Sequence, residues 1–382
     1  MNEERSRRWR MLLGSGPEGA ADGLSTQDAA MDAALAALYG HRPEDRGRRG
    51  GGLGDSAPRV ARWLGDIRRY FPSRVVQVMQ ADAIDRLGLK QLLLEPEMLE
   101  AVEADVHLVA TLASLGRIMP QKAKASAREV VGRVVRQVEE RLADRVQQAV
   151  RGALNRASRT TRPRLNDINW SRTIAANLGN YLPELKTVVP ERLIGYGRRQ
   201  TGFQREIVLV VDQSGSMAAS VVYASIFAAV LASIKTVKTH LVVYDTAVAD
   251  LTEQLNDPVE VIFGTQLGGG TDTSRALAYC EQLVQRPRDT VMVLISDLYD
   301  SQPKQMLRRI TQFQQQGVTV VALLALDDNG TPSYHHEVAN TLATMDVPAF
   351  ACTPDAFPEM IALAISKGDL AGWAAAEKAA GA

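Results

Sequence analysis

The stretch Ile207-Val-Leu-Val-Val-Asp-Gln-Ser-Gly-Ser-Met217 decides the fold that we expect for this chain. Five consecutive apolar residues, mostly β-branched, run directly into a polar loop, which is the pattern of a buried parallel strand followed by a helix. Ligands of open α/β sheets collect at such strand ends. Asp212, Ser214 and Ser216 stand at alternate positions of this tight loop, so their oxygens can converge on one point. Because Mg²⁺ and Mn²⁺ prefer oxygen donors of this kind, the loop indicates a metal site.

Two later segments can complete this site. Leu267-Gly-Gly-Gly-Thr271-Asp-Thr-Ser-Arg-Ala-Leu277 is a glycine-rich turn that enters a helix, and Val291-Met-Val-Leu-Ile-Ser-Asp297 is a second apolar strand that ends in a carboxylate. The three motifs, in this order and on these elements, resemble a von Willebrand factor A (VWA) domain with an intact metal-ion-dependent adhesion site. The resemblance covers residues 203–366.

This resemblance assigns a role to five residues. It implies that Ser214, Ser216 and Thr271 bind Mg²⁺, or Mn²⁺, through their hydroxyls. Asp212 and Asp297 would instead hold waters at the metal or lie next to its ligands without binding it directly. A cation with so few anionic protein ligands keeps much of its positive charge and one exchangeable position. A carboxylate of another protein can fill that position, so the expected activity is protein binding without catalysis.

The rim of the predicted site comprises Asp272, Tyr299 and Asp300, which we expect to lie beside a bound partner. Asp272 also stands where it can cap the helix that follows it. The family often has glycine after the second aspartate, whereas Leu298-Tyr299-Asp300 follow Asp297 here. This departure predicts a reshaped rim and leaves the role of Asp300 open.

Length and composition permit two domains with cores of their own, because the chain has 382 residues of which 46% are hydrophobic. No apolar run reaches about 18 residues, so we expect no membrane span. Met11-Leu-Leu is too short for the apolar part of a signal peptide, which favours a cytoplasmic protein. We interpret Cys280, in an expected helix, and Cys352, in an expected strand, as buried hydrophobes in a reducing compartment.

Charge is unevenly spread along the chain although its formal net charge is zero. Residues 1–205 carry 34 Lys and Arg against 24 Asp and Glu, and residues 206–382 carry 10 against 20. The two halves are therefore electrostatically opposite. This asymmetry can hold domains against one another or steer a charged partner, and the sequence does not divide these two effects.

The expected fold class is α/β, with a doubly wound, Rossmann-like VWA domain behind an α-helical N-terminal domain. Strand and helix patterns alternate through the C-terminal half. Strands are expected at 207–211, 240–244, 248–251, 290–295 and 318–326, and helices at 221–234, 257–263, 273–284, 303–316 and 354–365.

Six segments follow from these patterns. They are an N-terminal helical segment (1–40), capped by Ser25 or Thr26, a flexible linker (41–58), an α-helical domain (59–160), a connecting segment (161–202), the VWA domain (203–366) and an Ala-rich tail that frays (367–382). A second basic linker is expected from Asn155 to Arg164. A short helix with apolar anchors is expected from Trp170 to Pro183.

The longest periodic stretch runs from Ala127 to Leu154, with most of its arginines off the apolar stripe. We interpret it as an amphipathic helix of a bundle. A nucleic-acid surface that uses the arginines between Arg128 and Arg164 is the alternative, although aromatic stacking residues and a recognition motif are both missing. The stripe consists of Val131, Val134, Val135, Val138, Leu142, Val146, Val150 and Leu154.

Enzymatic motifs find little support. A phosphate-binding loop needs a lysine, which residues 264–271 lack. A serine hydrolase nucleophile needs Gly-x-Ser-x-Gly, and Gln213-Ser-Gly-Ser does not match that motif. A phosphotransfer aspartate at 212 would need a second carboxylate where Ser214 stands. We interpret His335-His336 as an exposed loop pair. A hydrolase acting at the metal is the remaining enzymatic alternative, and we expect a non-catalytic protein.

A helical half followed by a metal-site domain, with the lead-in from Trp170 to Leu178, is similar to the bacterial CoxE and ViaA-like groups. That similarity implies a MoxR-type AAA+ ATPase as partner. The pair would remodel a protein or metal-centre client in a chaperone-like way. This chain has no ATP site in its sequence, so the partner would supply the energy.

Overall fold

The computed structural model describes residues 25–39, 57–86, 93, 99, 102, 104–116, 118–157, 159–160, 168–196, 205–265, 270–326 and 333–380. The chain divides into two compact units, Met1–Val134 and Val135–Ala382, and each is described by itself. Helix α7 (Gln121–Ala157) crosses the boundary between them.

The first unit is helical. Besides the start of α7 it contains α2 (Thr26–Tyr39), α3 (Ala57–Tyr70), α4 (Ser73–Arg86) and α6 (Val106–Leu115). The Ser25 hydroxyl accepts the Asp28 N–H (3.1 Å), which confirms the predicted cap of α2. The buried Trp63 indole donates to the Ala34 carbonyl (2.9 Å) and ties α3 to α2. The linker predicted at 41–58 lies outside the described residues except at its end, where α3 already begins.

Helix α7 confirms the predicted amphipathic pattern. All eight residues of the stripe are buried, none more than 7% exposed. One later prediction about this region is wrong. A basic linker was expected from Asn155 to Arg164, but the helix continues to Ala157, and Arg159–Thr160 form β1, which pairs with β4 (Gly195–Tyr196). The end of the expected linker, 161–164, lies outside the described residues.

The second unit contains a six-stranded sheet in the order β10-β9-β8-β5-β6-β7. All pairs are parallel except β6 with β7, which is antiparallel at the edge. The predicted doubly wound α/β fold is therefore confirmed. The strands are β5 (Arg205–Asp212), β6 (Val237–Tyr244), β7 (Val248–Asp250), β8 (Thr290–Ile295), β9 (Thr319–Leu326) and β10 (Ala349–Cys352).

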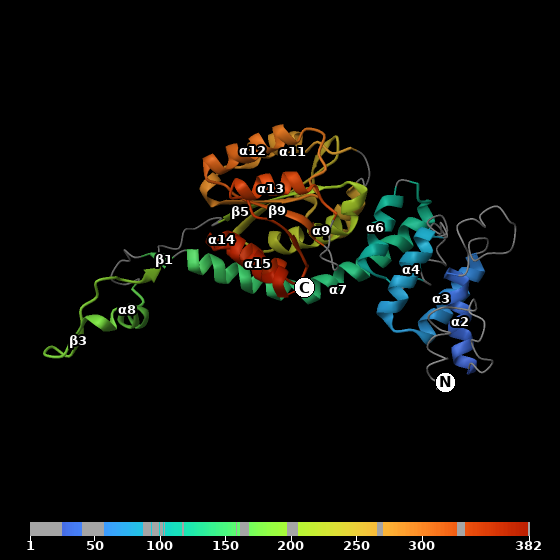
Figure 1. The fold of residues 1–382 in the computed structure, drawn as a ribbon, viewed down its shortest axis with the longest axis horizontal. Helices are drawn as coiled ribbons and strands as arrows, with labels where there is room; N and C mark the ends of the chain where they lie inside the picture. The colour runs from blue at the N-terminus through green and yellow to red at the C-terminus, as the bar shows by residue number, and fades with distance from the viewer. Residues whose placement is uncertain are drawn as a thin grey trace. The chain divides into compact units, whose positions relative to one another are not determined.

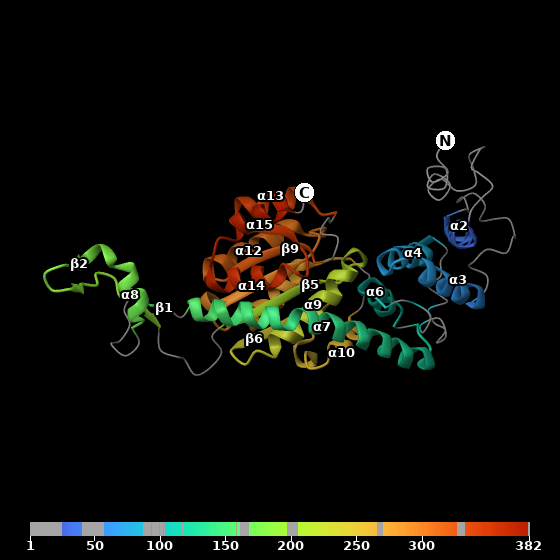
Figure 2. The same ribbon diagram turned by 90° about the horizontal axis from the view of Figure 1, so that it is seen from below.

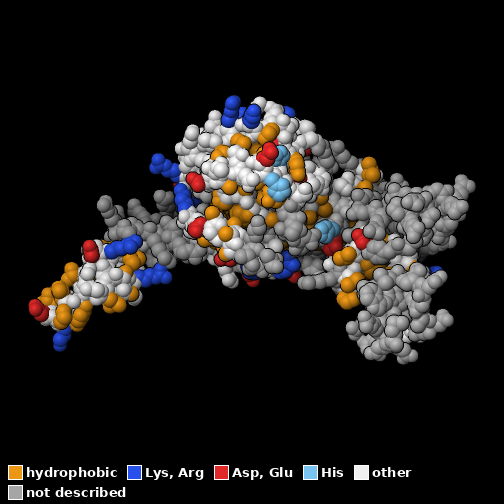
Figure 3. Space-filling model, viewed as in Figure 1, with side chains coloured by type: hydrophobic (Ala, Val, Ile, Leu, Met, Phe, Trp, Pro, Cys, Tyr) orange, Lys and Arg blue, Asp and Glu red, His pale blue; other side chains and the backbone are white. Residues whose placement is uncertain are grey.

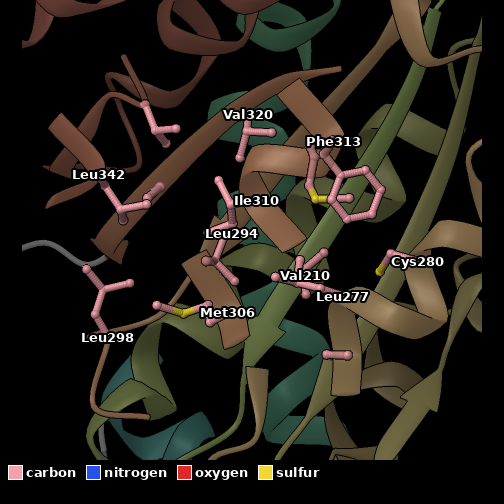
Figure 4. Close-up of a cluster of buried hydrophobic side chains, with 14 of the residues drawn as sticks. Val210, Leu277, Cys280, Leu294, Leu298, Met306, Ile310, Phe313, Val320 and Leu342 are labelled. Carbon is pink, nitrogen blue, oxygen red and sulfur yellow. The ribbon is translucent and has the colours of Figure 1, made fainter. Parts of the chain in front are cut away.

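Helices cover both faces of this sheet, with α11 and α12 on one side and α14 on the other (Figures 1 and 2). Alternate residues of each strand meet the α11 and α12 face, where Val210, Leu294 and Val320 pack against Ile310 and Phe313 (Figure 4). The helices are α9 (Ala218–Ala232), α10 (Pro258–Gly264), α11 (Thr273–Leu283), α12 (Pro303–Gln316), α13 (His336–Thr344), α14 (Phe357–Ser366) and α15 (Leu370–Ala380). Short 3₁₀ helices are η5 (Leu178–Asn180), η6 (Gly215–Met217), η7 (Thr252–Gln254) and η8 (Pro287–Asp289).

Two helices depart from the sequence prediction. His335-His336, expected in a loop, starts α13, and the His335 ring accepts the Val338 N–H (3.4 Å) as its N-cap. The tail expected to fray forms α15, whose Trp373 ring packs edge-on against Phe350 (5.5 Å). α15 has a weak apolar period, so tertiary contacts decide its structure, whereas the buried Val338, Ala339 and Leu342 of α13 recur at helical spacing and were an available signal that the prediction missed.

Residues 168–196 form a small module, which we call the apolar module. It contains α8 (Trp170–Ala176), η5, the hairpin of β2 (Tyr181–Leu182) with β3 (Thr187–Val188), and β4. The helix predicted up to Pro183 ends at Ala176. The predicted helix start at Trp170 is confirmed, but its end is wrong, and its expected apolar anchors are exposed, Trp170 by 51% and Ile174 by 45%.

The stretch Gly215–Ala232 is the only part of the described chain that is long and apolar enough to cross a membrane by composition alone. Within the structure 72% of it is buried. It has the surroundings of a core helix packed on the sheet.

A buried carboxylate organises the amino-terminal end of the sheet. Glu206 is 4% exposed, and its Oε1 lies 3.2 Å from both Lys238 Nζ and His240 Nε2. Its Oε2 accepts the Gln285 N–H and the Thr290 hydroxyl, each at 3.1 Å. Burial raises the pKa of Glu206, but these hydrogen bonds and the Lys238 charge outweigh it, so the pKa lies below the ordinary 4.5.

We predict that Glu206→Gln lowers the free energy of unfolding by about 2–4 kcal/mol at neutral pH, because it leaves buried donors without their anionic acceptor. A group whose pKa is lowered by folding contributes stability above its unfolded pKa and loses it as the pH falls. The difference between wild type and variant should therefore shrink below pH 4.5. Urea unfolding measures it, with the exposed Glu253→Gln as control. A difference that does not change with pH would contradict this account.

Candidate metal centre

The strand order brings two sequence motifs to one edge of the sheet. β5 pairs with β8 in parallel, with Val211 opposite Ile295, so Asp212 and Asp297 follow adjacent strand ends. β6 flanks β5 on its other side, where Asp212 lies opposite Tyr244. This is the carboxyl edge at which a parallel sheet collects ligands.

The loop after β5 turns its side chains toward the end of β8. The Ser214 N–H donates to Asp212 Oδ1 (2.8 Å), and η6 then leads directly into α9. The Ser214 and Ser216 hydroxyl oxygens lie 3.2 Å apart. The Ser216 hydroxyl donates to Asp297 Oδ2 (2.6 Å). Four of the five predicted site residues therefore form one hydrogen-bonded group.

Asp212 is the buried member of this group, with no exposed surface. Burial raises its pKa to about 6, and the nearby Asp297 charge adds to the rise, while hydrogen bonds from Ser214 and Ser296 oppose it. The charged form of Asp212 is thus costly where it stands. A cation bound beside it would favour the carboxylate and lower this pKa.

Thr271 lies half-buried in the loop that enters α11. Its carbonyl accepts the backbone N–H (3.2 Å) and the hydroxyl (3.0 Å) of Ser301, and the next N–H donates to the Asp245 carbonyl (2.9 Å). These bonds tie the Thr271 loop to the loops after β6 and β8. Thr271 as a metal ligand stays a prediction. Residues 266–269, Gly268 and Gly269 included, lie outside the described residues.

The three rim residues differ in what they do. Asp272 accepts the Arg275 N–H (3.0 Å) and caps α11, the capping role that its position predicted. Asp300 accepts the Thr273 N–H on one oxygen (2.7 Å) and the Gln302 N–H on the other, so both carboxylate oxygens accept hydrogen bonds from the backbone. Its role, left open by the sequence, is to join the β8 loop to the start of α11.

Tyr299 is the exposed member of the rim, with 51% of its surface accessible. Its ring lies 5.6 Å from the His335 ring. The backbone N–H of His335 donates to the Asp297 carbonyl (2.9 Å). An aromatic and imidazole pair therefore stands beside the Asp297 loop. Nothing in the sequence predicts that His335 lies there.

Sequence reasoning missed two residues that support this edge. The buried Ser296 donates its hydroxyl to Asp212 Oδ2 (2.9 Å) and holds the second carboxylate oxygen. The Tyr244 hydroxyl bonds the Thr273 hydroxyl (3.1 Å) and links β6 to α11. Ser296 stands next to Asp297 in the second strand motif, which was the available signal. Tyr244 resembles any other apolar strand residue in the sequence.

Leu298 explains how the chain replaces the glycine that the family often has after the second aspartate. Its backbone has φ 65°, a left-handed conformation that costs any residue other than glycine about 1–2 kcal/mol. The side chain is fully buried in the cluster with Met306 and Val320 (Figure 4). Burial therefore offsets the strain, and the Asp297 loop keeps its turn without glycine.

The donors present suit a hard cation. Among the described residues no group of three or more His, Cys, Asp or Glu side chains could hold a metal, which leaves no support there for a transition-metal site. The group at the sheet edge consists of carboxylates and hydroxyls only. Oxygen donors of this kind fit Mg²⁺ or Mn²⁺.

Residues 142–361 match the family of VWA domain containing CoxE-like proteins. The chain is also 34% identical over 373 residues to the uncharacterized protein YehP of Escherichia coli K12, covering 96% of this chain and 95% of that protein. The match with YehP extends through the helical half, beyond the residues 142–361 that match the family.

Two solved structures match parts of the chain at low similarity. A von Willebrand factor type A protein from Catenulispora acidiphila is 17% identical, with a TM-score of 0.33 and 43% of each chain covered. An aerotolerance-related membrane protein from Bacteroides fragilis is 12% identical, with a TM-score of 0.34, and covers 43% of this chain and 99% of that one.

We predict that millimolar Mg²⁺ raises the thermal midpoint of wild type by several degrees. A ligand present at about 100 times its Kd adds about 2.7 kcal/mol to the folded state. Ser216→Ala should abolish most of this rise because it removes a hydroxyl at the centre of the group. Differential scanning calorimetry measures it, with Ser233→Ala, an exposed hydroxyl on the end of α9, as control. An equal rise in all three proteins would show that the cation binds elsewhere.

We further predict that Leu298→Gly destabilises the protein by about 2–4 kcal/mol, because lost burial outweighs relieved strain. Lys367→Gly, at another left-handed residue (φ 54°) that follows α14 and is exposed, should change stability by less than about 1 kcal/mol. Urea unfolding compares the two. A stabilised Leu298→Gly variant would mean that strain dominates this loop.

Proposed function

The chain belongs to the family of VWA-domain-containing CoxE-like proteins, and from this premise we propose that it is a metal-dependent protein-binding module. The observation that carries the proposal is the hydrogen-bonded group of Ser214, Ser216 and Asp297 at the carboxyl edge of the sheet, with Asp212 buried behind it. Such a group has oxygen donors but few anionic ones at its surface.

When bound, Mg²⁺ would supply positive charge and an exchangeable coordination position at the protein surface. Ser214, Ser216 and Thr271 would hold it through their hydroxyls, while Asp212 and Asp297 orient these hydroxyls and balance part of the charge. The exposed Ser216 marks the side from which a partner would approach. A carboxylate of that partner is the natural complement of this surface.

The helices that begin at the site favour the same ligand. α9 starts at Ala218, directly after the first loop, and α11 starts at Thr273, directly after the second. Helix N-termini carry partial positive charge, so both support an anionic group at this edge. The proposal includes no catalytic step, since binding alone accounts for the residues present.

We propose that the partner is a MoxR-type AAA+ ATPase, or a client that the ATPase remodels, and that this chain acts in the cytoplasm as an adaptor or co-chaperone. Membership in the CoxE-like family supports this pairing by resemblance. The acidic C-terminal half, with 10 Lys and Arg against 20 Asp and Glu in residues 206–382, favours a partner with a basic surface around the contacting carboxylate.

The rival reading, a nucleic-acid surface along α7, gains no support from the described part of that helix. Its exposed arginines are interleaved with acidic residues. One of them, Arg145, bonds the Asp355 carboxylate (2.8 Å) and carbonyl (3.1 Å) next to α14. These contacts fit a helix packed in the fold.

We predict that tagged wild-type protein retains an AAA+ ATPase from extract of the source cells in millimolar Mg²⁺ and loses it in excess chelator. Ser214→Ala/Ser216→Ala should lose it in both buffers, because the variant lacks two hydroxyl ligands. Mass spectrometry identifies the bound proteins. Ser233→Ala/Ser366→Ala removes the same number of hydroxyls away from the site and should behave as wild type.

Recovery of the same ATPase by every variant, with and without chelator, would contradict the metal-bridged contact. It would assign ATPase binding to another surface of the chain. Circular dichroism of each variant confirms that the fold is intact before the comparison is made.

A further inference from the structure

Four aromatic and imidazole side chains gather beside the Asp297 loop, and we call them the ring cluster. They are Tyr299, Tyr334, His335 and His336. The Tyr299 ring lies 5.6 Å from the His335 ring, and the Tyr334 ring lies 4.3 Å from the His336 ring. Figure 3 shows histidine side chains, in pale blue, beside an acidic one, in red, on the part of the surface that carries α13.

The ring cluster is attached to the same residue that completes the candidate metal centre. Asp297 Oδ2 accepts the Ser216 hydroxyl (2.6 Å), and its Oδ1 accepts the Tyr299 N–H (3.3 Å). The Asp297 carbonyl accepts the backbone N–H of His335 (2.9 Å). A partner whose carboxylate binds the proposed cation would therefore lie next to the Tyr299 and His335 rings.

Tyr299 is the member of the cluster that offers aromatic surface without a structural duty. It is 51% exposed, whereas Tyr334 is half-buried and packs against the hydrophobic core. The His335 ring accepts the Val338 N–H through Nδ1 (3.4 Å). A ring nitrogen that accepts a hydrogen bond carries no proton, so His335 is a neutral imidazole here. It adds no positive charge beside Tyr299.

The charges around the rings favour a cation as their ligand. Within two positions of the four rings the chain carries Asp297, Asp300 and Glu337, and neither Lys nor Arg. Two positions span at most about 8 Å of backbone, which is about one Debye length in physiological salt. These carboxylates therefore act on the ring surface. An exposed aromatic ring among carboxylates attracts a guanidinium or an ammonium group.

The proposed metal would not reverse this preference. Mg²⁺ carries two positive charges, and the carboxylates of Asp212 and Asp297 balance them. The partner's carboxylate then adds a negative charge to those of Asp300 and Glu337. A basic side chain near that carboxylate would offset this excess. Arginine fits best, because its planar guanidinium stacks on an aromatic ring.

We propose that Tyr299 is a specificity-determining residue, which selects a partner segment with an arginine close to the acidic residue at the metal. Tyr299 stands two residues from Asp297, a separation that an arginine within two residues of the partner's carboxylate can span. The preferred segment is therefore an acidic and basic pair, and a purely acidic segment binds less well. This inference rests on the proposed function, because it needs a carboxylate at the cation.

A peptide selection on the full chain tests the preference. The probe is a library of blocked heptapeptides with a fixed central aspartate, two random residues on each side of it and glycine at both ends. Immobilised protein retains peptides in millimolar Mg²⁺, chelator elutes them, and mass spectrometry reads their sequences. We expect wild type to enrich arginine over glutamine by about three- to thirtyfold at one or more random positions.

Variants of the ring assign the preference to Tyr299. Tyr299→Ala should still retain peptides in Mg²⁺ but lose the arginine enrichment, whereas Tyr299→Phe keeps the aromatic face and should keep the enrichment. Tyr181→Ala is the matched control, because it removes a tyrosine of similar exposure (49%) in the apolar module. It should select the same peptides as wild type.

Two kinds of failure are distinguishable. Retention in Mg²⁺ without arginine enrichment, or enrichment that survives Tyr299→Ala, would overturn this inference and leave the metal-bridged contact standing. Wild type that retains no peptide, or that retains the library equally well in chelator or with asparagine in place of the aspartate, would contradict the proposed function and this inference with it.

Discussion

The buried carboxylate of Asp212 is the constraint on which the functional edge of this protein depends. It ends the central strand, flanked on both sides by parallel neighbours, and no water-exposed surface relieves its charge. The surrounding loops stabilise this buried charge in part, since Ser214 and Ser296 each donate a hydrogen bond to one of the Asp212 oxygens. Because these donors come from β5 and from the end of β8, the same bonds that satisfy Asp212 align the two loops. A divalent cation would complete the compensation, and the ordering of these loops would follow.

The loops are fixed by backbone contacts more than by the site side chains themselves. Asp300 holds the start of α11, and Ser301 holds the carbonyl of Thr271. Leu298, which precedes both residues, turns the chain in a left-handed conformation that its burial sustains. The residues with predicted ligand roles are therefore carried on a frame that can keep its shape while a partner exchanges at the surface. Because the contacts that fix the loops are distinct from the predicted ligands, the site suits a reversible, metal-dependent contact.

The sheet and the motif order could be predicted from the sequence because buried parallel strands are continuous apolar runs, and β5, β8 and β9 are such runs. The grouping of Ser214, Ser216 and Asp297 was expected from the resemblance to VWA domains, and the pairing of β5 with β8 accounts for it. The remainder depended on tertiary contacts. α15 has a weak local pattern, the role of Asp300 depends on where α11 begins, and Tyr244 reaches Thr273 only in three dimensions. The exposed side chains of the apolar module were misjudged because apolar spacing indicates burial without saying what covers it.

We propose that the protein binds its partner through a cation held by hydroxyls. A crystal grown with Mn²⁺ tests that claim most directly, through the anomalous scattering of the metal. We predict one strong anomalous peak at the carboxyl edge of the sheet, within coordination distance of the Ser214 and Ser216 hydroxyls and of Thr271. Ordered loops with no peak there at saturating Mn²⁺ would contradict the account.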